Sequence, residues 1–254
     1  SMPGAALMAT LAALRSGAGL VTALVPETLV PAFAARAPEA MWLPATETPD
    51  GGIALENLTP VRAALSRATT LVVGPGLGRE RETQAFVQGL LALAECPVVI
   101  DADAIQPAIL DALTAKPSRP VVITPHAGEF ARLRGRATAE PVTNAELIAF
   151  ALERSLTVVL KGPVSRVSDG RHVYHSLFGG PVLARGGSGD LLAGLIGGRL
   201  AASDEDTLVK VAQGLAWHGL AADRLARHQN ATSAVATDLL AHFAPALNET
   251  AHEP

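Results

Sequence analysis

Apolar residues along this chain fall into short, nearly unbroken blocks separated by longer segments of mixed character. Four blocks rich in valine, isoleucine and leucine occupy residues 70–73, 97–100, 121–124 and 157–160. Each is short and is followed by glycine, proline or a polar residue, which favours strands over helices. Because both faces of such a block are apolar, the pattern predicts strands of a parallel sheet covered on both sides.

The segments between these blocks have helical character. Helices are expected at residues 4–16, 61–67, 80–94, 106–114, 143–154, 190–201, 207–227 and 233–243. A further strand at 20–25 ends before Pro26, and Asp169-Gly170 joins residues 164–168 and 171–174 in a predicted hairpin. The proline- and glycine-bearing segment 44–60 is expected to be a loop, and the polar tail from Asn248 is expected to fray.

Strands that alternate with helices predict an α/β fold, a three-layer structure with a mostly parallel sheet flanked by helices. The 254 residues are expected to form a single domain over residues 1–254. Hydrophobic residues make up 49% of the chain and aromatic residues only 4%, so small aliphatic side chains are expected to fill the interior.

Charge and cysteine usage exclude several classes of protein. The net charge of −4 provides no basic surface for a nucleic-acid backbone. Cys96 is the single cysteine, which excludes an intramolecular disulfide and a cysteine metal cluster and suits a cytoplasmic location. No apolar run approaches the roughly 18 residues of a membrane span, so no membrane partner is expected. The start, Ser1-Met2-Pro3, lacks the charged region of a signal peptide, and Ser1 is interpreted as a residue left by cloning or trimming.

Polar and glycine-rich motifs follow the predicted strands. They are Gly74-Pro75-Gly76-Leu77-Gly78, Asp101-Ala102-Asp103-Ala104, Thr124-Pro125-His126-Ala127-Gly128-Glu129 and Lys161-Gly162. Ligands of open α/β sheets bind outside the carboxyl ends of the strands. The sequence therefore predicts one crevice lined by these loops.

The run Gly186-Gly187-Ser188-Gly189-Asp190 precedes an apolar helix. Backbone amides in such a turn can point at a phosphate, and the helix dipole adds positive potential. A carboxylate beside a bound anion is repelled by it, so its presence there indicates a separate function. Asp190 is suited to act as the base that takes the proton of a hydroxyl attacking a phosphoryl group. The alternative is an ordinary helix start with an acidic first turn.

Individual residues in the loops have a functional and a structural interpretation. His126 lies in a rigid frame at the crevice, or is an ordinary exposed loop histidine; with no second histidine or cysteine at ligand spacing, a metal site there is not expected. Lys161 is interpreted either as a residue whose ammonium contacts a polyphosphate, or as a lysine at the sheet edge that extends its charged end into water. Asp101 and Asp103 hold Mg²⁺ through water or cap the next helix. The segment around Trp217 and His218 is interpreted as an amphipathic helix and nothing more.

Five motifs in series, from about residue 4 to 243, resemble the ADP-dependent NAD(P)H-hydrate dehydratases, the dehydratase half of the YjeF-type repair proteins in the ribokinase-like superfamily. The motifs are Gly17-Ala18-Gly19-Leu20-Val21, Val73-Gly74-Pro75-Gly76-Leu77-Gly78, Ile123-Thr124-Pro125-His126-Ala127-Gly128-Glu129-Phe130, Leu160-Lys161-Gly162 and Ala184-Arg185-Gly186-Gly187-Ser188-Gly189-Asp190-Leu191-Leu192-Ala193-Gly194.

The resemblance implies a ribokinase-like fold and a repair lyase. Such an enzyme uses ADP to phosphorylate the hydroxyl of (6S)-NAD(P)H hydrate and then eliminates phosphate, which leaves AMP and restored NAD(P)H. It implies Mg²⁺ with ADP, a symmetric homo-oligomer such as a tetramer, and a fused epimerase domain in some native genes. No residue set for a protein-bound metal is implied.

The resemblance also assigns residues. Asp190 is the implied base, and Ala5, Gly76, His126 and Asp190 are the implied contacts of the hydrate. Gly186, Gly187 and Ser188 form the implied anion turn, and the amides of residues 187–189 are implied to stabilise charge on the transferring phosphoryl group. The implied AMP or ADP contacts are Lys161, Gly162, Pro163, Val164, Ser165 and Gly189. The chain departs from the family pattern at three positions: Pro163 lacks an N–H, Ser165 stands where a threonine is usual, and Gly180 stands where an asparagine is usual.

Two rival functions share these features. A small-molecule alcohol kinase of the same superfamily, of the hydroxymethylpyrimidine or hydroxyethylthiazole type, would use the same turn and aspartate with ATP. The His-x-Gly-Glu at residues 126–129 favours the dehydratase. A non-catalytic nucleotide-binding protein is the other rival, and the intact Asp190 beside an intact glycine turn speaks against it.

Overall fold

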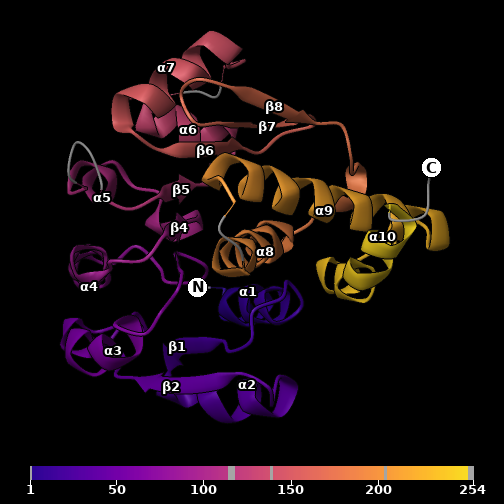
Figure 1. The fold of residues 1–254 in the computed structure, drawn as a ribbon. Helices are drawn as coiled ribbons and strands as arrows, with labels where there is room; N and C mark the ends of the chain where they lie inside the picture. The colour runs from indigo at the N-terminus through magenta and orange to yellow at the C-terminus, as the bar shows by residue number, and fades with distance from the viewer. Residues whose placement is uncertain (1, 114–117, 138–139, 203–204, 251–254) are drawn as a thin grey trace.

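The computed structural model describes residues 2–113, 118–137, 140–202 and 205–250 of the chain. Its main sheet has six strands in the order β3-β4-β5-β6-β7-β8 (Figure 1). The first four pair in parallel, and the last two complete an antiparallel hairpin at the edge. The strands are β3 Leu71–Val73, β4 Val98–Ile100, β5 Val121–Ile123, β6 Thr157–Leu160, β7 Ser165–Ser168 and β8 Val173–Ser176.

Helices cover both faces of this sheet, so the predicted three-layer α/β fold is confirmed (Figure 1). On one face lie α3 Leu58–Leu65, α4 Arg81–Leu93, α5 Pro107–Asp111, α6 Ala127–Leu133 and α7 Asn144–Arg154; on the other lie α1 Gly4–Leu14, α8 Ser188–Ala202, α9 Thr207–His228 and α10 Phe243–Thr250. Alternate strand residues point to opposite faces. Val98 and Ile100 therefore join the core under the first group, and Val99 packs with α8 and α9.

The alanine-rich α1 packs along α8. Three of its four buried residues, Ala5, Ala9 and Ala12, have a methyl group as side chain, so the two helix backbones can approach closely. Eleven residues of α8 are buried, because α8 is held between the sheet, α1 and α9. This packing fixes the start of α8, which carries the glycine turn.

The structure corrects several local predictions. Segment 44–60 is not all loop: Pro44 and Ala45 belong to β2 (Met41–Ala45), which pairs in parallel with β1 (Thr22–Pro26). A proline is tolerated there because the sheet has two strands and hence free edges. The short helices α2 (Val30–Arg36) and α6 were not expected, and the chain beyond Asn248 continues in α10 to Thr250.

The region predicted as one helix at 233–243 instead contains a 3-10 segment, Ala236–Ala241, followed by α10. The end of the helix predicted at 106–114 lies outside the described residues. Within the described part of the chain, no helix is both long and apolar enough to cross a membrane.

Candidate active site

The loops after the four parallel strands meet at one edge of the sheet, as the sequence predicts. The Lys161 amide donates to the Pro125 carbonyl at 2.8 Å, and residues 126 and 161 form an isolated parallel bridge. Between β4 and β5, the Thr124 amide donates to the Ile100 carbonyl at 3.2 Å, and between β3 and β4 the backbone of Gly74 lies against the Asp101 carbonyl. These contacts bring the ends of β3, β4, β5 and β6 together.

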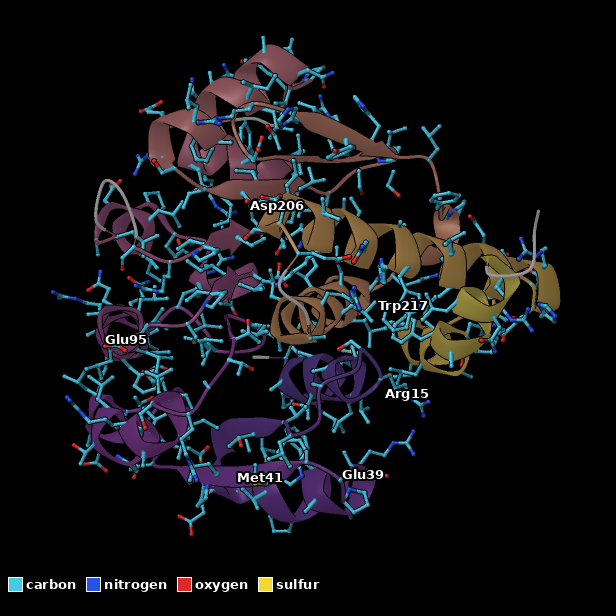
Figure 2. All side chains as sticks on the ribbon, viewed as in Figure 1. Arg15, Glu39, Met41, Glu95, Asp206 and Trp217 are labelled. Carbon is cyan, nitrogen blue, oxygen red and sulfur yellow. The ribbon has the colours of Figure 1, made fainter. Side chains whose placement is uncertain are left out.

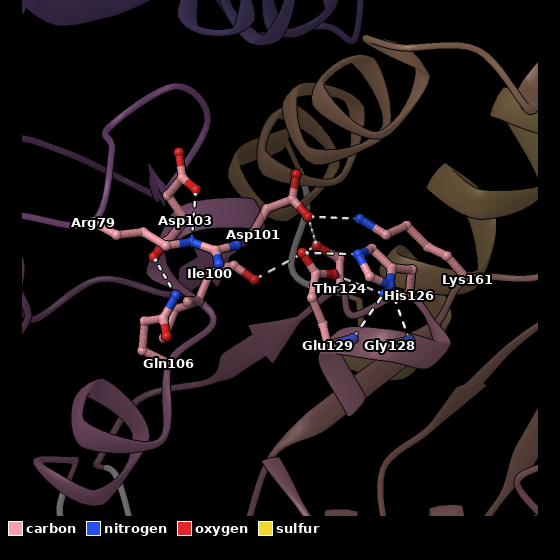
Figure 3. A network of polar contacts seen from close by, with 10 residues as sticks. All are labelled: Arg79, Ile100, Asp101, Asp103, Gln106, Thr124, His126, Gly128, Glu129 and Lys161. Atoms are coloured by element: carbon pink, nitrogen blue, oxygen red, sulfur yellow. Dashed lines mark hydrogen bonds and ion pairs between the residues drawn. The ribbon is translucent and has the colours of Figure 1, made fainter. Parts of the chain in front are cut away.

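Asp101 is the centre of a polar network at this edge (Figure 3). Its side chain is 1% exposed, and Oδ1 accepts from Thr124 Oγ1 at 2.5 Å and from Lys161 Nζ at 2.8 Å. Buried charges are stable only when paired, so this carboxylate fixes where the ammonium of Lys161 lies. The structure thus gives Asp101 a role that neither sequence interpretation contained, because its side chain makes no helix-capping bond.

The Lys161 ammonium lies over the start of α8. A Cβ built on Gly189 would stand 3.3 Å from Lys161 Nζ, so the absence of a side chain at this position leaves room for the lysine. Asp190, the next residue, is buried in the first turn of the same helix. The ends of β4 and β6 and the start of α8 therefore meet around one space.

Asp190 has an unusual electrostatic environment. Burial raises the pKa of its carboxyl to about 6, with Asp101 and Asp103 adding to the rise and Lys161 opposing it. No hydrogen-bond donor among the described residues contacts its carboxylate. A carboxylate with a raised pKa and no partner is suited to accept a proton from a bound molecule.

Free backbone donors lie at the start of α8. Gly187 adopts a φ of 95° and its carbonyl accepts from Leu191, which begins the helix. The Ser188 amide donates to the Arg185 carbonyl at 3.2 Å. The amides of Gly189 and Asp190 have no acceptor within the described residues, so these two N–H groups can meet an anion, with the helix dipole behind them.

His126 is the N-cap of α6 rather than a loop residue. Its Nδ1 accepts from the amides of Gly128 and Glu129, and Glu129 bonds back to the His126 amide at 2.8 Å. Because Nδ1 is an acceptor, the ring proton lies on Nε2, 3.4 Å from the Glu129 carboxylate. The side chain is 56% exposed, so the imidazole ring remains accessible to a bound molecule.

Ala5, at the start of α1, and Gly76, in the loop after β3, lie against each other. A Cβ on Gly76 would stand 3.2 Å from the Ala5 Cβ, and Ala5 itself is buried. Beside them is a cavity of about 200 Å³ between the 75–77 loop and the β1 region, with mostly apolar walls. Its lining includes Pro3, Ala6, Leu24, Phe33, Ile53 and Leu77.

The turn after Lys161 is closed by its own serine. Ser165 Oγ lies 3.3 Å from both the amide and the carbonyl of Gly162, and residues 162–164 are exposed. The hydroxyl retained at Ser165 thus shapes the turn in which Pro163 has no N–H to offer. Gly180, the third departure from the family pattern, lies at the start of the 3-10 segment Pro181–Leu183.

Sequence reasoning missed three contacts of this site. Thr124 and Asp101 are 23 residues apart in the chain, and the Asp101–Lys161 pair spans 60. His218, interpreted as part of an ordinary amphipathic helix, is buried and lies 3.3 Å from Ser188 Oγ through its Nε2. An uncharged polar residue on the apolar side of a helix was the one available signal.

No group of three or more His, Cys, Asp or Glu side chains in the described parts of the chain is placed to hold a metal ion. The charge of the site is nevertheless unbalanced. Asp103 is paired with the Arg79 guanidinium at 3.1 Å, so the Lys161 ammonium is left to offset both Asp101 and Asp190. A polyphosphate entering this region would add negative charge and would require a cation.

Comparisons with known proteins agree with one another. The family model for NAD(P)H-hydrate dehydratase matches residues 1–245. A bifunctional NAD(P)H-hydrate repair enzyme from Moorella thermoacetica is 37% identical over 244 residues, which are 94% of this chain and 46% of that protein. An ADP-dependent (S)-NAD(P)H-hydrate dehydratase from Xanthomonas campestris is 37% identical over 230 residues, 89% of this chain and 77% of that protein. The chain therefore spans about half of the bifunctional relative.

Solved structures give the same result. An ADP/ATP-dependent NAD(P)H-hydrate dehydratase from Bacillus subtilis, co-crystallised with ATP and Mg²⁺, has a TM-score of 0.82 and 29% identity over 98% of this chain and 85% of that one. Phosphofructokinase-2 from Escherichia coli, at 17% identity and a TM-score of 0.63 over 95% of this chain and 86% of that one, shares the fold alone. The chain belongs to the NAD(P)H-hydrate dehydratase family and has its ribokinase-like α/β fold.

Proposed function

We propose that this chain catalyses the ADP-dependent dehydration of (6S)-NAD(P)H hydrate to NAD(P)H, with release of AMP and phosphate. The observation that carries the proposal is the unpartnered, buried carboxylate of Asp190 beside the Lys161 ammonium and the free amides at the start of α8. Family membership supports the same activity, since the relatives that match most of this chain are named for it.

Each group has a role in this reaction. Asp190 takes the proton of the hydrate hydroxyl while the hydroxyl oxygen bonds to the β-phosphorus of ADP and AMP departs. In the second step the ring loses phosphate and a proton from the neighbouring carbon, which restores the ring double bond. The free N–H groups of residues 189 and 190 stabilise charge on the transferred phosphoryl group. Lys161, held by Asp101, neutralises phosphate charge.

The remaining assignments are proposed on position. Gly162, Pro163, Val164 and Ser165 form the exposed turn beside Lys161 and are proposed, with Gly189, to bind AMP or ADP. The glycine turn at residues 186–188 shapes the anion site, although the Ser188 amide is already bonded to Arg185. Ala5, Gly76 and His126 are proposed to contact the hydrate; because Ala5 and Gly76 pack together, their contacts would come from the main chain.

The donor set fits Mg²⁺ carried by the nucleotide rather than a metal held by the protein alone. Asp101 is the carboxylate that would hold it, because its Oδ1 alone is bonded to Thr124 and Lys161, and this leaves Asp190 free to accept the hydroxyl proton. When bound, Mg²⁺ neutralises the charge of the polyphosphate. The protein residues position the hydroxyl and accept its proton.

A direct assay tests the activity. Purified protein is mixed with hydrated NADH, and recovery of absorbance at 340 nm is followed with ADP, with ATP and with neither. Recovery that requires a nucleotide supports the dehydratase. No recovery, together with ATP-dependent phosphorylation of a vitamin-precursor alcohol, would overturn the proposal in favour of the alcohol kinase.

The pKa of Asp190 gives a pH prediction. The base must be ionised, and the pKa of this carboxyl in the free protein is about 6. The kcat/KM for the hydrate should therefore rise with pH, be half-maximal near pH 6 and level off above it, because kcat/KM reports the free enzyme. Initial rates between pH 4.5 and 8, measured with the hydrate and ADP both well below their KM values so that the free enzyme is observed, check this; a profile flat down to pH 4.5 would exclude Asp190 as the titrating base.

Three further expectations belong to the same proposal. The chain is expected to assemble as a symmetric homo-oligomer such as a tetramer, which light scattering on the purified protein can measure.

The bifunctional relatives are about twice as long, so an epimerase domain in the native gene is proposed by analogy. A cytoplasmic location is proposed because the single thiol, Cys96, is free.

A further inference from the structure

A buried histidine of the neighbouring helix contacts the start of α8. His218 belongs to α9, is 4% exposed, and its Nε2 lies 3.3 Å from Ser188 Oγ. Ser188 is 3% exposed and is the first residue of α8. The contact therefore joins two helices through one hydrogen bond that solvent does not reach.

Within residues 186–189, Ser188 is the one residue with a side chain, because the others are glycines. Arg185, just before the turn, is held by hydrogen bonds from its guanidinium to the carbonyls of Ala231 and Thr232. Beside Gly187 lie the apolar end of Met8 and the Cβ of Ala236. The hydroxyl of Ser188 thus provides the polar side-chain connection from the turn to α9.

His218 is neutral in this setting. Burial lowers the pKa of the imidazole to about 4; the Ser188 main chain opposes this fall, and the charge of Lys161 adds a smaller lowering effect. A neutral ring has one N–H and one acceptor nitrogen, so it can hold a hydroxyl in one orientation without adding charge to the site. A cation at position 218 would instead compete with Lys161.

We propose that His218 is a positioning residue of the reaction: through the Ser188 hydroxyl it fixes the first turn of α8, and thereby the amides and the Asp190 carboxylate that meet the nucleotide and the hydrate. This inference rests on the proposed function. Misplacing reacting groups by as little as about 1 Å can cost up to about a hundredfold in rate, so one buried hydrogen bond at this point has a large effect on turnover.

Two variants test the contact from its two ends. His218→Leu and Ser188→Ala should each lower kcat/KM for the hydrate by about tenfold to a hundredfold. Each should also weaken ADP binding, measured by calorimetry. His218→Gln, which retains a neutral donor and acceptor, should recover much of the loss. The double variant His218→Leu/Ser188→Ala should be no worse than the single ones, because both remove the same bond.

Trp217 offers a matched control. It is the neighbouring buried residue of α9, but its indole N–H donates to the Phe243 carbonyl at 2.7 Å, on the α10 side (Figure 2). Trp217→Phe removes one buried hydrogen bond from the same helix. It should lower the melting temperature and leave kcat/KM and the ADP dissociation constant unchanged.

The outcomes separate this inference from the proposed function. If His218→Leu and Ser188→Ala behave like Trp217→Phe, or if their effects add in the double variant, the positioning role is wrong. If the wild-type protein regenerates no NADH from the hydrate, the proposed function fails. ADP calorimetry on the same variants still decides whether His218 positions the turn. If His218→Leu does not fold, Ser188→Ala and His218→Gln carry the test.

Discussion

Asp190→Asn is expected to lower kcat by roughly 10²–10⁴-fold, the usual contribution of a positioned base. The amide side chain has nearly the same size but cannot take the hydroxyl proton. ADP binding should persist, because the amides and Lys161 that meet the phosphates are unchanged. Single-turnover assays and ADP calorimetry on the same preparation check both parts.

The same variant should also be more stable than the wild type. Folding raises the pKa of Asp190 from 3.8 to about 6, so the native state favours the protonated form. The ionised carboxylate therefore destabilises the fold above about pH 6, and this penalty is lost as the pH falls through the folded pKa toward the unfolded one. By this reasoning, Asp190→Asn stabilises the protein at pH 7.5 by up to about 3 kcal/mol.

A melting temperature that rises as activity disappears would identify Asp190 as a functional residue held at a cost in stability. The opposite pattern, in which the variant loses ADP binding and melts earlier, would show that the carboxylate is structural. Retained turnover would remove Asp190 from the mechanism altogether.

Much of this architecture could be predicted from local patterns. The strands at 97–100 and 157–160 are apolar on both faces, and the structure places them in the parallel part of the sheet. Which loops share an edge followed from the same pattern, since parallel strands point their carboxyl ends in one direction. The position of Asp190 at the start of a helix could likewise be predicted from the glycines before it.

The contacts that the sequence could not reveal are those between distant residues. Lys161 had an apolar strand before it and a glycine after it, and nothing local indicated that Asp101 would hold its ammonium. His126 was expected in a loop because histidine is an uncommon helix cap, yet its Nδ1 accepts two amides as an aspartate would. His218 could not be paired with Ser188 before α8 and α9 were packed together.

Gly74→Ala is expected to be among the most damaging single-methyl changes in the chain. Gly74 has a φ of 127°, a conformation that non-glycine residues rarely adopt at a cost of about 1–3 kcal/mol. A Cβ there would also overlap the Asp101 carbonyl oxygen and stand 3.1 Å from the Ala104 Cβ. The ends of β3 and β4 would have to separate, so the total loss should exceed about 3 kcal/mol of unfolding free energy.

Separating the ends of β3 and β4 would disturb the active site as well as the core. Asp101 is the residue displaced, and its side chain holds Lys161, so Gly74→Ala should weaken ADP binding in whatever fraction remains folded. Urea unfolding followed by circular dichroism measures the first effect, and calorimetry measures the second.

Gly78→Ala supplies the matched control in the same loop. Gly78 also has a positive φ, 77°, but a Cβ there would have no heavy atom within 4 Å. Only the backbone strain remains, so the cost should be about 1–2 kcal/mol, and ADP binding should stay at the wild-type level. Because the two variants add the same methyl group to glycines four positions apart, a difference between them isolates the close approach of β3 to Asp101. Equal losses would mean that backbone conformation alone accounts for both glycines and that the strand ends tolerate separation.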